Sequence, residues 1–383
     1  KKICSLFLCL MMLLTCFPAG VSKAAGSLPQ TAAEYAASDY AQYAARMAVG
    51  EAHYVFIKAD GTVTVRGGDT TYQQGNVPAG LSGVKAVAAG AYHTLALTED
   101  GHVLTWGTRQ DASGNYISAT IPAEVQAVQG SIKLIAAGGT MSAVVTNNND
   151  VIVWGKSSTL GPPAGLGNIV AIGISSVIAL TLNDAGNVKV WGNSGCTTVP
   201  PGLNGNVVAI SSGQMHWLAL KKDGTVSITG PNGQIGQCKN IINQTGVRAI
   251  AGGWQSAMAL LDDGSVKGWG RTPVNPSATE GVELIPASAG IRALAATVVG
   301  GAGNSPSICA MQGDGTIKLA ATSAFLTMVG ESANLSNLTI DGYDLAPAFD
   351  AATTAYTVSI PNVAGSVYMT ATTADLAATL NIN

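Results

Sequence analysis

Charged and aromatic residues are scarce in this sequence, and long apolar runs are absent outside its N-terminal end. Asp, Glu, Lys and Arg make up 11% of the 383 residues, and Phe, Trp and Tyr make up 5%. The formal net charge is −3, and there is no cluster of Lys and Arg of the kind that neutralises phosphates, so we predict no nucleic-acid partner. No segment beyond the N-terminal end has the apolar length that spans a bilayer, so we predict no transmembrane span in the mature chain.

Cysteine is also sparse, and its spacing excludes two common roles. Three of the six cysteines lie in the first 16 residues, and the other three, Cys196, Cys238 and Cys309, are far apart. An odd number without a C-x-x-C pair argues against a disulfide framework and a metal site. We expect buried free thiols, although one bridge would also fit. The chain lacks the Lys-Ser/Thr end of a phosphate loop and a D-x-D-x-D-G calcium loop, so we predict no cofactor and no metal.

The N-terminal end is typical of a secretory signal peptide, over residues 1–24. "KKICSLFLCLMMLLTCF" has a basic start and an apolar core, and Ser22-Lys23-Ala24 places small residues where a signal peptidase cleaves. A lipoprotein acylated on Cys16 is the alternative, but Thr15 is bulky for the residue before such a cysteine. We therefore predict a secreted, extracellular protein, which could also be attached to the cell surface.

Glycine is abundant, with 47 residues, and much of it marks a repeat. In "AYHTLALTEDGHVLTWG" apolar and polar residues alternate on both sides of Asp100-Gly101. This alternation around an Asp-Gly pair predicts two antiparallel strands joined by a tight turn. The pattern returns six more times, at intervals of about 40 residues, with Asn149 in place of the glycine in one copy. A short apolar strand such as "VKAVAAG" precedes each hairpin.

A unit of three or four strands that recurs about every 40 residues is typical of a propeller blade, because one small sheet cannot bury either face alone. We predict an all-β fold, a seven-bladed β-propeller over residues 45–327. Connectors rich in Pro and Gly, such as "VPAGLSGV", suit the turns between blades. The preceding segment, residues 25–44, could add a ring-closing strand or form a helix, and the sequence leaves both open.

The skeleton V-x-A-[IV]-x-x-G-x-x-H-x-x-A-L-x-x-D-G-x-V-x-x-W-G resembles the regulator of chromosome condensation repeat. The Pro-x-Gly-Leu connectors are similar to those of a secreted bacterial branch that includes the propeller-type β-lactamase inhibitory protein. The resemblance covers residues 45–321 and implies the propeller fold. It implies no single function, because propellers carry many unrelated activities. The chromatin and exchange-factor roles of the eukaryotic relatives do not carry over to an acidic, sparsely charged chain.

The last part of the chain leaves the propeller pattern. We predict a linker over residues 328–334 and a partial β-sandwich over residues 335–383. Its L-x-x-L-x-I, L-x-P-x-F-D and Y-x-V-x-I-P segments resemble the cadherin-like domain of bacterial surface proteins. A sandwich needs about seven strands, and about four fit here. We therefore expect the natural chain to continue past Asn383, with modules that could associate with the cell wall.

Residues that recur in register within the repeat are expected to be structural. Three histidines lie eight residues before the turn glycine, where other repeats have Met, Ile or Ser, so we predict that each ring bonds a backbone carbonyl between blades. They are His53, His93 and His216, and a metal site shared by the first two is the alternative. Four tryptophans close hairpins and are expected to pack in the core or between blades. They are Trp106, Trp154, Trp191 and Trp269.

A second set of large residues departs from this register and forms the predicted binding site. Tyr92, Met215 and Trp254 lie in the short loops between the first and second strands of their repeats, and Tyr54 and Trp217 directly follow a histidine. These loops should emerge at one end of the ring, and Tyr and Trp dominate protein–protein hot spots. The resemblance to the lactamase inhibitor implies a similar use of loop aromatics. The alternative is that these residues are partly buried loop residues.

We therefore expect a secreted or cell-surface bacterial scaffold that binds a protein through one face of the propeller. An inhibitor of a secreted or periplasmic enzyme, such as a β-lactamase, is the first alternative, although a diffusing inhibitor has no need of a sandwich module. A carbohydrate-active enzyme or a carbohydrate-binding propeller is the second. An enzyme is disfavoured because the sequence has no His/Asp/Ser or paired-acid cluster outside its turns.

Overall fold

The computed structural model describes the chain from Leu28 to Ile382, with gaps. The gaps are residues 52, 59, 68–71, 108, 111–115, 118–119, 156–160, 193–194, 231–238, 272–277, 288–289, 297–307, 313–316, 322–324, 331–334, 341–354, 360–366 and 374–377. The predicted signal peptide and Cys238 therefore lie outside the described residues. Within the described part of the chain, no helix has the length and apolar character needed to cross a membrane.

The repeats fold into antiparallel hairpins around their turn residues. In the second blade, β5 (Thr94–Thr98) pairs with β6 (Val103–Trp106) across the Asp100-Gly101 turn. Gly101 has a φ of 81°, in the left-handed region that glycine adopts at little cost. Asn149, which replaces this glycine in the next blade, has a φ of 69°. The turns therefore follow from local backbone chemistry.

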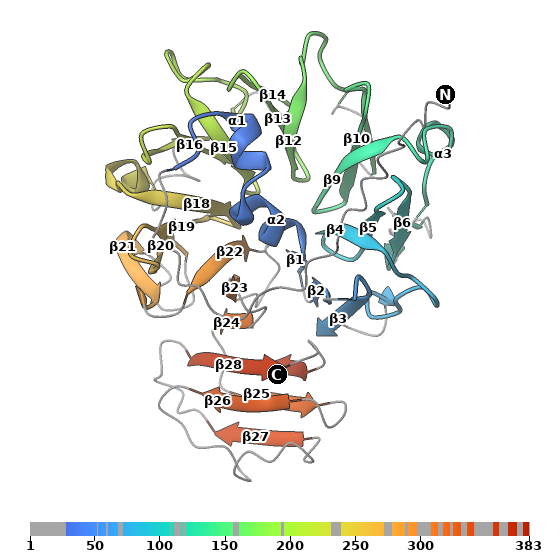
Figure 1. Cartoon of the computed structure of the whole chain (residues 1–383), viewed down its shortest axis with the longest axis vertical. Coiled ribbons are helices and arrows are strands. Elements are labelled where there is room, and N and C mark those ends of the chain that lie inside the picture. Colours follow the sequence, from blue (N-terminus) through green and yellow to red (C-terminus); the bar gives the residue numbers. More distant parts are fainter. Residues whose placement is uncertain are drawn as a thin grey trace, which may run out of the picture.

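Seven small antiparallel sheets, one for each repeat, stand around a central axis (Figure 1). The inner strand of each sheet contacts the inner strands of both neighbouring sheets, and the first sheet contacts the last, so the ring closes. The predicted seven-bladed propeller is confirmed. The strands of the successive blades are β1 (Met47–Val49), β2 (His53–Ile57) and β3 (Val63–Gly67); β4 (Val84–Ala89), β5 and β6; β9 (Ile132–Gly138), β10 (Met141–Thr146) and β11 (Val151–Gly155); β12 (Ile169–Ile174), β13 (Ile178–Asn183) and β14 (Val188–Gly192); β15 (Val207–Ser212), β16 (Trp217–Lys221) and β17 (Val226–Thr229); β18 (Val247–Gly252), β19 (Ser256–Leu261), β20 (Val266–Gly270) and β21 (Ala278–Ile285); and β22 (Ile291–Ala296), β23 (Ile308–Gln312) and β24 (Ile317–Ala321). Short elements in the connections are β7 (Arg109–Gln110), β8 (Tyr116–Ile117), α3 (Ala123–Gln126) and η2 (Lys239–Asn243).

The inner strands of the second to seventh blades share a β-bulge at their second residue. In β4, Val84 pairs with Thr98 and Ala86 pairs with Leu97, so Lys85 has no partner on β5. The same shift occurs in β9, β12, β15, β18 and β22. A bulge residue leaves the ladder and its side chain is re-aimed. The bulge therefore places one residue of each of these blades in a special position near the central axis.

The hydrophobic core is divided among the gaps between neighbouring blades. Trp106 packs with Val55 and Val65 of the preceding blade, and Trp191 packs with Met141 and Val145 in the same way. Trp269 belongs to the cluster of the fifth and sixth blades, and the partly buried Trp154 packs on that of the second and third. Each tryptophan thus joins its blade to the one before it, which is how stacked small sheets bury their faces.

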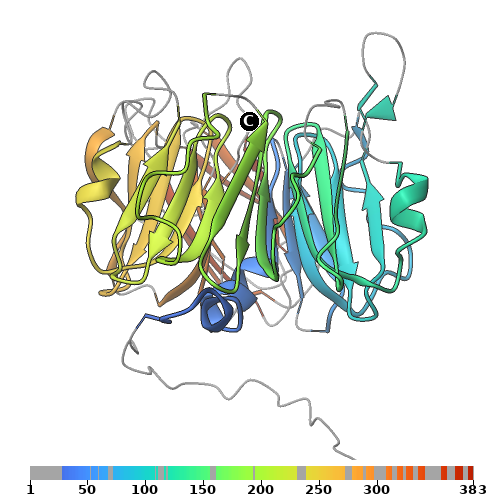
Figure 2. The same ribbon diagram turned by 90° about the horizontal axis from the view of Figure 1, so that it is seen from above.

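The segment before the first blade forms helices rather than a ring-closing strand. α1 (Ala32–Ala36) begins with a capping box, in which Thr31 Oγ1 accepts from Glu34 N at 3.1 Å and Glu34 Oε2 accepts from Thr31 N at 3.2 Å. α2 (Asp39–Ala45) follows, and both helices lie at the end of the ring that carries the hairpin turns (Figure 2). Tyr35 of α1 is buried, and its OH donates to Arg248 O at 3.0 Å. Of the two possibilities that the sequence leaves open for this segment, the helix is the one found at residues 32–36 and 39–45, because a capped, alanine-rich segment favours a helix.

The C-terminal strands pair with one another and with the last blade of the propeller. β25 (Phe325–Gly330) lies partly on the predicted linker and pairs with β27 (Ala355–Ser359) and β29 (Ala378–Ile382). β28 (Val367–Thr373) pairs with β26 (Leu335–Ile340) and also with β24, so it extends the sheet of the last blade. The open edge of β24 presents unpaired N–H and C=O groups, which a further strand satisfies. That residues 335–383 form a separable unit stays a prediction.

Candidate protein-binding face

The short loops between the first and second strands of the blades share one end of the ring. We call this end the loop face, and it is made by residues 50–51, 90–93, 139–140, 175–177, 213–216 and 253–255. Each inner strand runs from the end with the hairpin turns to the loop face, so α1 and α2 lie at the opposite end (Figure 2). The predicted binding residues all lie in these loops or at the strand ends beside them.

The loops of neighbouring blades are joined to one another by hydrogen bonds. Glu51 N donates to Ala91 O at 3.3 Å, and Ala91 N donates to Gly139 O at 2.7 Å. Further around the ring, Ser175 Oγ donates to Gln214 O at 2.8 Å. These bonds tie the loops of the first three blades to one another and the loop of the fourth blade to that of the fifth, which limits their freedom to rearrange on binding.

The three repeat histidines lie beneath the loop face and bridge adjacent blades. His53 Nε2 is 3.0 Å from Thr94 Oγ1, and His93 Nε2 is 2.8 Å from Ser142 Oγ. His216 Nε2 is 3.1 Å from Ser256 O. The predicted carbonyl partner is therefore present for His216, whereas hydroxyl groups take its place for the other two rings.

Burial governs the protonation of these histidines. Their exposed fractions are 1% or less. Removal from water lowers the pKa of His53 and of His216 to about 4, and burial together with the nearby His53 lowers the pKa of His93 to about 3. All three rings are therefore neutral at pH 7 and serve as hydrogen-bonding contacts between blades.

Tyr92 forms one of two side-chain pairs on the loop face. Its ring is half-buried and lies 4.7 Å from the ring of Tyr72, centroid to centroid, with an angle of 52° between the planes. Tyr72 comes from the connection after β3 and was not predicted from the sequence. The connections between blades differ in length and sequence, so a residue in one of them has no equivalent position in the other repeats. The contact between these two rings is therefore visible only in the fold.

Trp254 forms the second pair. The Arg271 guanidinium carbon lies 4.8 Å from the centroid of the Trp254 ring, within the range of a cation–π interaction. Gln255, the next residue, has a φ of 54° and accepts from Arg271 N at 2.9 Å. The strained loop and the hydrogen bond hold the indole beside the guanidinium. Arg271 follows the Trp-Gly end of its hairpin in the sequence, but nothing in that position marks it as a partner of Trp254.

The other predicted binding residues are less accessible than expected. Met215 is half-buried and packs against the core between the fourth and fifth blades. Trp217 is fully buried within β16 and donates to Cys196 O at 2.8 Å, and Tyr54 is 6% exposed within β2. The expectation that Tyr54 and Trp217 lie on the exposed loops is therefore wrong. Trp217 is the first residue of β16 and Tyr54 is the second residue of β2, so both belong to strands whose side chains enter the core.

The described residues of this face do not meet the requirements of a metal site. Among the described residues, no group of three or more His, Cys, Asp and Glu side chains could hold a metal ion. Cys196 and Cys309 are buried free thiols, and Cys196 Sγ lies 3.0 Å from Met215 O. The described loop residues therefore offer aromatic, thioether and guanidinium groups, which suit binding.

Comparisons with known proteins agree with this fold. Residues 84–111 match the family model of the regulator of chromosome condensation (RCC1) repeat. The ectodomain of the Physcomitrella patens receptor kinase CR4 is similar, with a TM-score of 0.53 and 18% identity over 69% of this chain and 69% of that chain. The CRINKLY WD40 ectodomain of the Arabidopsis thaliana receptor kinase ACR4 has a TM-score of 0.52 and 15% identity, over 71% of this chain and 92% of that chain. Yeast RCC1 (Prp20) bound to Kap60 has a TM-score of 0.46 and 21% identity, over 62% of this chain and 70% of that chain. A search of curated proteins finds no match.

Proposed function

We propose that this protein is a non-enzymatic scaffold that binds a protein partner through its loop face. The observation that carries the proposal is the pair of contacts Tyr72–Tyr92 and Trp254–Arg271. The Tyr92 loop is bonded to the loops of both neighbouring blades, and the Trp254 loop is bonded to Arg271 of its own blade. Tyr, Trp and Arg are the side chains that contribute most to protein–protein hot spots. The RCC1-type repeat and the propeller neighbours support a binding role at this level.

The rigidity of the loop face favours tight binding. Association costs free energy when loops and side chains must be ordered, so a surface that is already ordered retains more of its contact energy. Gln255 is held in the left-handed region, and the bond from Ala91 N to Gly139 O is short at 2.7 Å. The loop face is therefore organised before any partner arrives.

Alanine substitution tests the proposal. We expect Tyr92→Ala and Trp254→Ala each to weaken binding by about thirtyfold, which corresponds to about 2 kcal/mol, in a pull-down and titration with a partner captured from secreted and cell-wall fractions. Both variants should keep the wild-type melting temperature within a few degrees, because neither side chain fills the core. Trp106→Ala is the matched control, since Trp106 packs between blades and its loss should lower the melting temperature first.

Two results would count against the loop face. One is normal binding by both Tyr92→Ala and Trp254→Ala. The other is unfolding of these variants as readily as Trp106→Ala, which would make the two aromatics packing residues. In either case the partner would bind another surface of the propeller.

Inhibition of a secreted or periplasmic enzyme, such as a β-lactamase, is the second candidate. The half-buried aromatic rings of Tyr92 and Trp254 favour it, because a protein inhibitor also needs rigid anchors on one face. Assays of purified β-lactamases with the wild-type protein and with Trp254→Ala distinguish this candidate from a surface scaffold. Inhibition by the wild-type protein that the variant loses would support it.

Secretion is part of the proposal and has its own test. Cleavage after Ala24 should give secreted material whose N-terminal sequence begins "AGSLPQ". A different N-terminus, or a lipid on Cys16, would overturn this assignment.

A further inference from the structure

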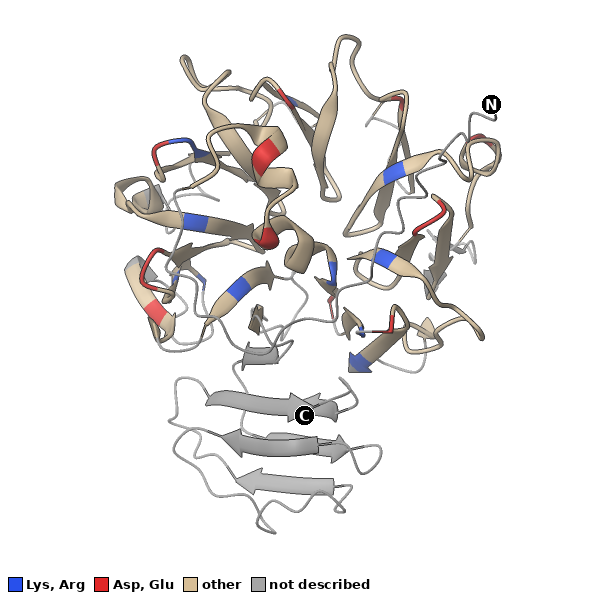
Figure 3. Cartoon of the chain, in the orientation of Figure 1, with Lys and Arg blue, Asp and Glu red and all other residues tan. Residues whose placement is uncertain are grey.

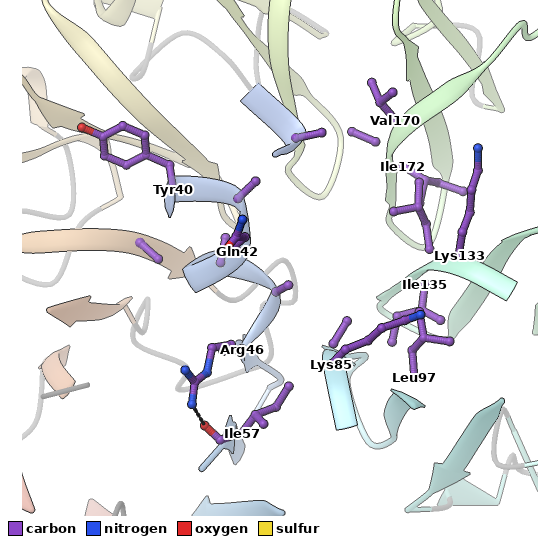
Figure 4. A pocket seen from close by; sticks show the side chains of 18 of the residues that line it. Tyr40, Gln42, Arg46, Ile57, Lys85, Leu97, Lys133, Ile135, Val170 and Ile172 are labelled. Atoms are coloured by element: carbon purple, nitrogen blue, oxygen red, sulfur yellow. Dashed lines mark hydrogen bonds between the residues drawn. The ribbon is translucent and has the colours of Figure 1, made fainter. Parts of the chain in front are cut away.

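A cavity of about 990 Å³ lies on the central axis, at the end of the ring opposite the loop face. Its walls are the inner strands of the blades and one side of α1 and α2 (Figure 4). Gln42 and Arg46 lie on the side of the helices, and Lys85, Leu97, Lys133 and Ile135 face them from the blades. The volume is in the range of sites that enclose a small molecule.

The floor of the cavity is aliphatic. The fourth residue of the inner strand lines it in several blades, and these side chains are only partly buried. They are Ile135, Ile172, Ile210 and Ile250. Apolar side chains in contact with water around a concave space gain free energy when an apolar ligand covers them. The floor therefore suits a hydrocarbon group.

The rim of the cavity is positively charged, although the chain as a whole is acidic. Four basic residues line the cavity against two acidic ones. The basic residues are Arg46, Lys58, Lys85 and Lys133, and the acidic residues are Asp60 and Glu99. The local excess of positive charge attracts an anionic group.

The β-bulge explains where the charge is placed. The bulge residue is basic in four blades, and Figure 3 shows these positions as blue segments on β4, β9, β18 and β22. It is apolar in the other two, which have Val170 on β12 and Val208 on β15. α1 packs over these two strands, with Ala32 in the cluster of Val170 and Tyr35 in that of Val208. The helix thus covers the apolar bulge residues and leaves Lys85 and Lys133 along the open wall.

The ammonium groups on the open wall are held by neutral oxygens. Lys133 Nζ donates to Asn149 Oδ1 at 2.7 Å and to Asn168 Oδ1 at 3.3 Å. Lys85 Nζ lies 3.4 Å from Glu99 O, a backbone carbonyl. Asp184 interacts electrostatically with Lys133, but neither ammonium group is in a salt bridge among the described residues, so both can contact an anionic group on a ligand.

We propose that this cavity binds an amphiphile with one anionic head group, such as a long-chain carboxylate or an alkyl phosphate. The hydrocarbon chain lies along the floor between Ile135 and Ile172, and the head group lies against Lys85 and Lys133. This site is separate from the loop face, so it can be tested independently of the protein-binding proposal.

Competition with a fluorescent probe tests the chemistry of the ligand. Dansyl-undecanoate is titrated into the purified protein and then displaced with dodecanoate, dodecyl phosphate, dodecanol or inorganic phosphate. We expect dodecanoate and dodecyl phosphate to displace the probe at concentrations at least tenfold below dodecanol, and inorganic phosphate to be ineffective. Displacement by dodecanol as readily as by dodecanoate would overturn the role of the charge, and displacement by inorganic phosphate would overturn the role of the chain.

Three variants locate the site. The double variant Lys85→Gln/Lys133→Gln should weaken dodecanoate about tenfold and leave dodecanol unchanged. Gln42→Trp, on the exposed side of α2 that faces the cavity, should block both ligands while preserving the fold, which thermal unfolding checks. Lys189→Gln is the matched control, because Lys189 is exposed on β14 and does not line the cavity. Wild-type affinity in Gln42→Trp or in the double variant would overturn the proposal.

Discussion

Mild acid should destabilise the propeller through its three buried histidines. His53, His93 and His216 have folded pKa values of about 4, 3 and 4 because burial disfavours the charged ring. In the unfolded chain the same rings titrate with a pKa of about 6.5. Between about pH 6.5 and pH 4 the unfolded state therefore binds more protons than the folded state, and the free energy of unfolding falls as the pH falls. Above about pH 7 this loss is absent.

The size of the effect follows from these pKa values. A pH of 5 is about 1.5 units below the unfolded pKa of each ring and still above its folded pKa. Each ring therefore lowers the free energy of unfolding by about 2 kcal/mol at this pH. Three rings together give about 6 kcal/mol, within the total stability of about 5–15 kcal/mol that domains have. The aspartates of the hairpin turns affect stability in a more acidic pH range. Hydrogen bonds from nearby hydroxyl groups lower their pKa from 3.8, so the stability that they contribute is lost only below that pH. They are Asp60, Asp100, Asp223 and Asp263.

Urea unfolding at pH 7.5 and pH 5, followed by tryptophan fluorescence, measures this loss. The variant His93→Met uses the residue that Met141 provides at the same position of the next blade. It should reduce the loss between the two pH values by about 2 kcal/mol, whatever its stability at neutral pH. His102→Gln is the control, because the side chain of His102 is 51% exposed. An equal loss in wild type and His93→Met, or no loss in wild type, would refute the assignment of the acid effect to the buried rings.

Three further substitutions test the local packing. Gly90→Ala should lower the free energy of unfolding by about 3 kcal/mol in urea titration, because the new Cβ would overlap the ring of His93. Gly75→Ala, where a Cβ meets nothing within 4 Å, should be nearly neutral by the same measurement. Asn149→Gly should lower the melting temperature although glycine suits the φ of 69°, because Asn149 Oδ1 accepts from Ile169 N at 2.8 Å. A higher melting temperature for Asn149→Gly would show that relief of backbone strain outweighs the lost hydrogen bond.

The loop face was only partly predictable, because its exposure depends on the residue at which each loop ends and the buried second strand begins. Trp217 and Tyr92 differ by two positions relative to their repeat histidines, yet one is fully buried and the other is half-buried on the loop. A sequence pattern places a strand end only to within a residue or two, and here that residue decides whether a side chain stays on the loop or enters a strand that is buried on both faces. Tyr72 and Arg271 could not be found, because contacts between connectors of different length depend on the closed ring.

The sequence by itself determined the repeating hairpin and the number of blades, because Asp-Gly turns and period-two alternation act between residues close in the chain. It also marked the tryptophans that pack between blades, since each recurs in register. Only the tertiary structure decided that residues 32–45 form helices at one end of the axis and that β28 pairs with β24. Ring closure likewise brings the bulge lysines of separate repeats to the rim of one cavity. These features join segments far apart in the chain, so their free energy depends on packing partners that no local pattern encodes.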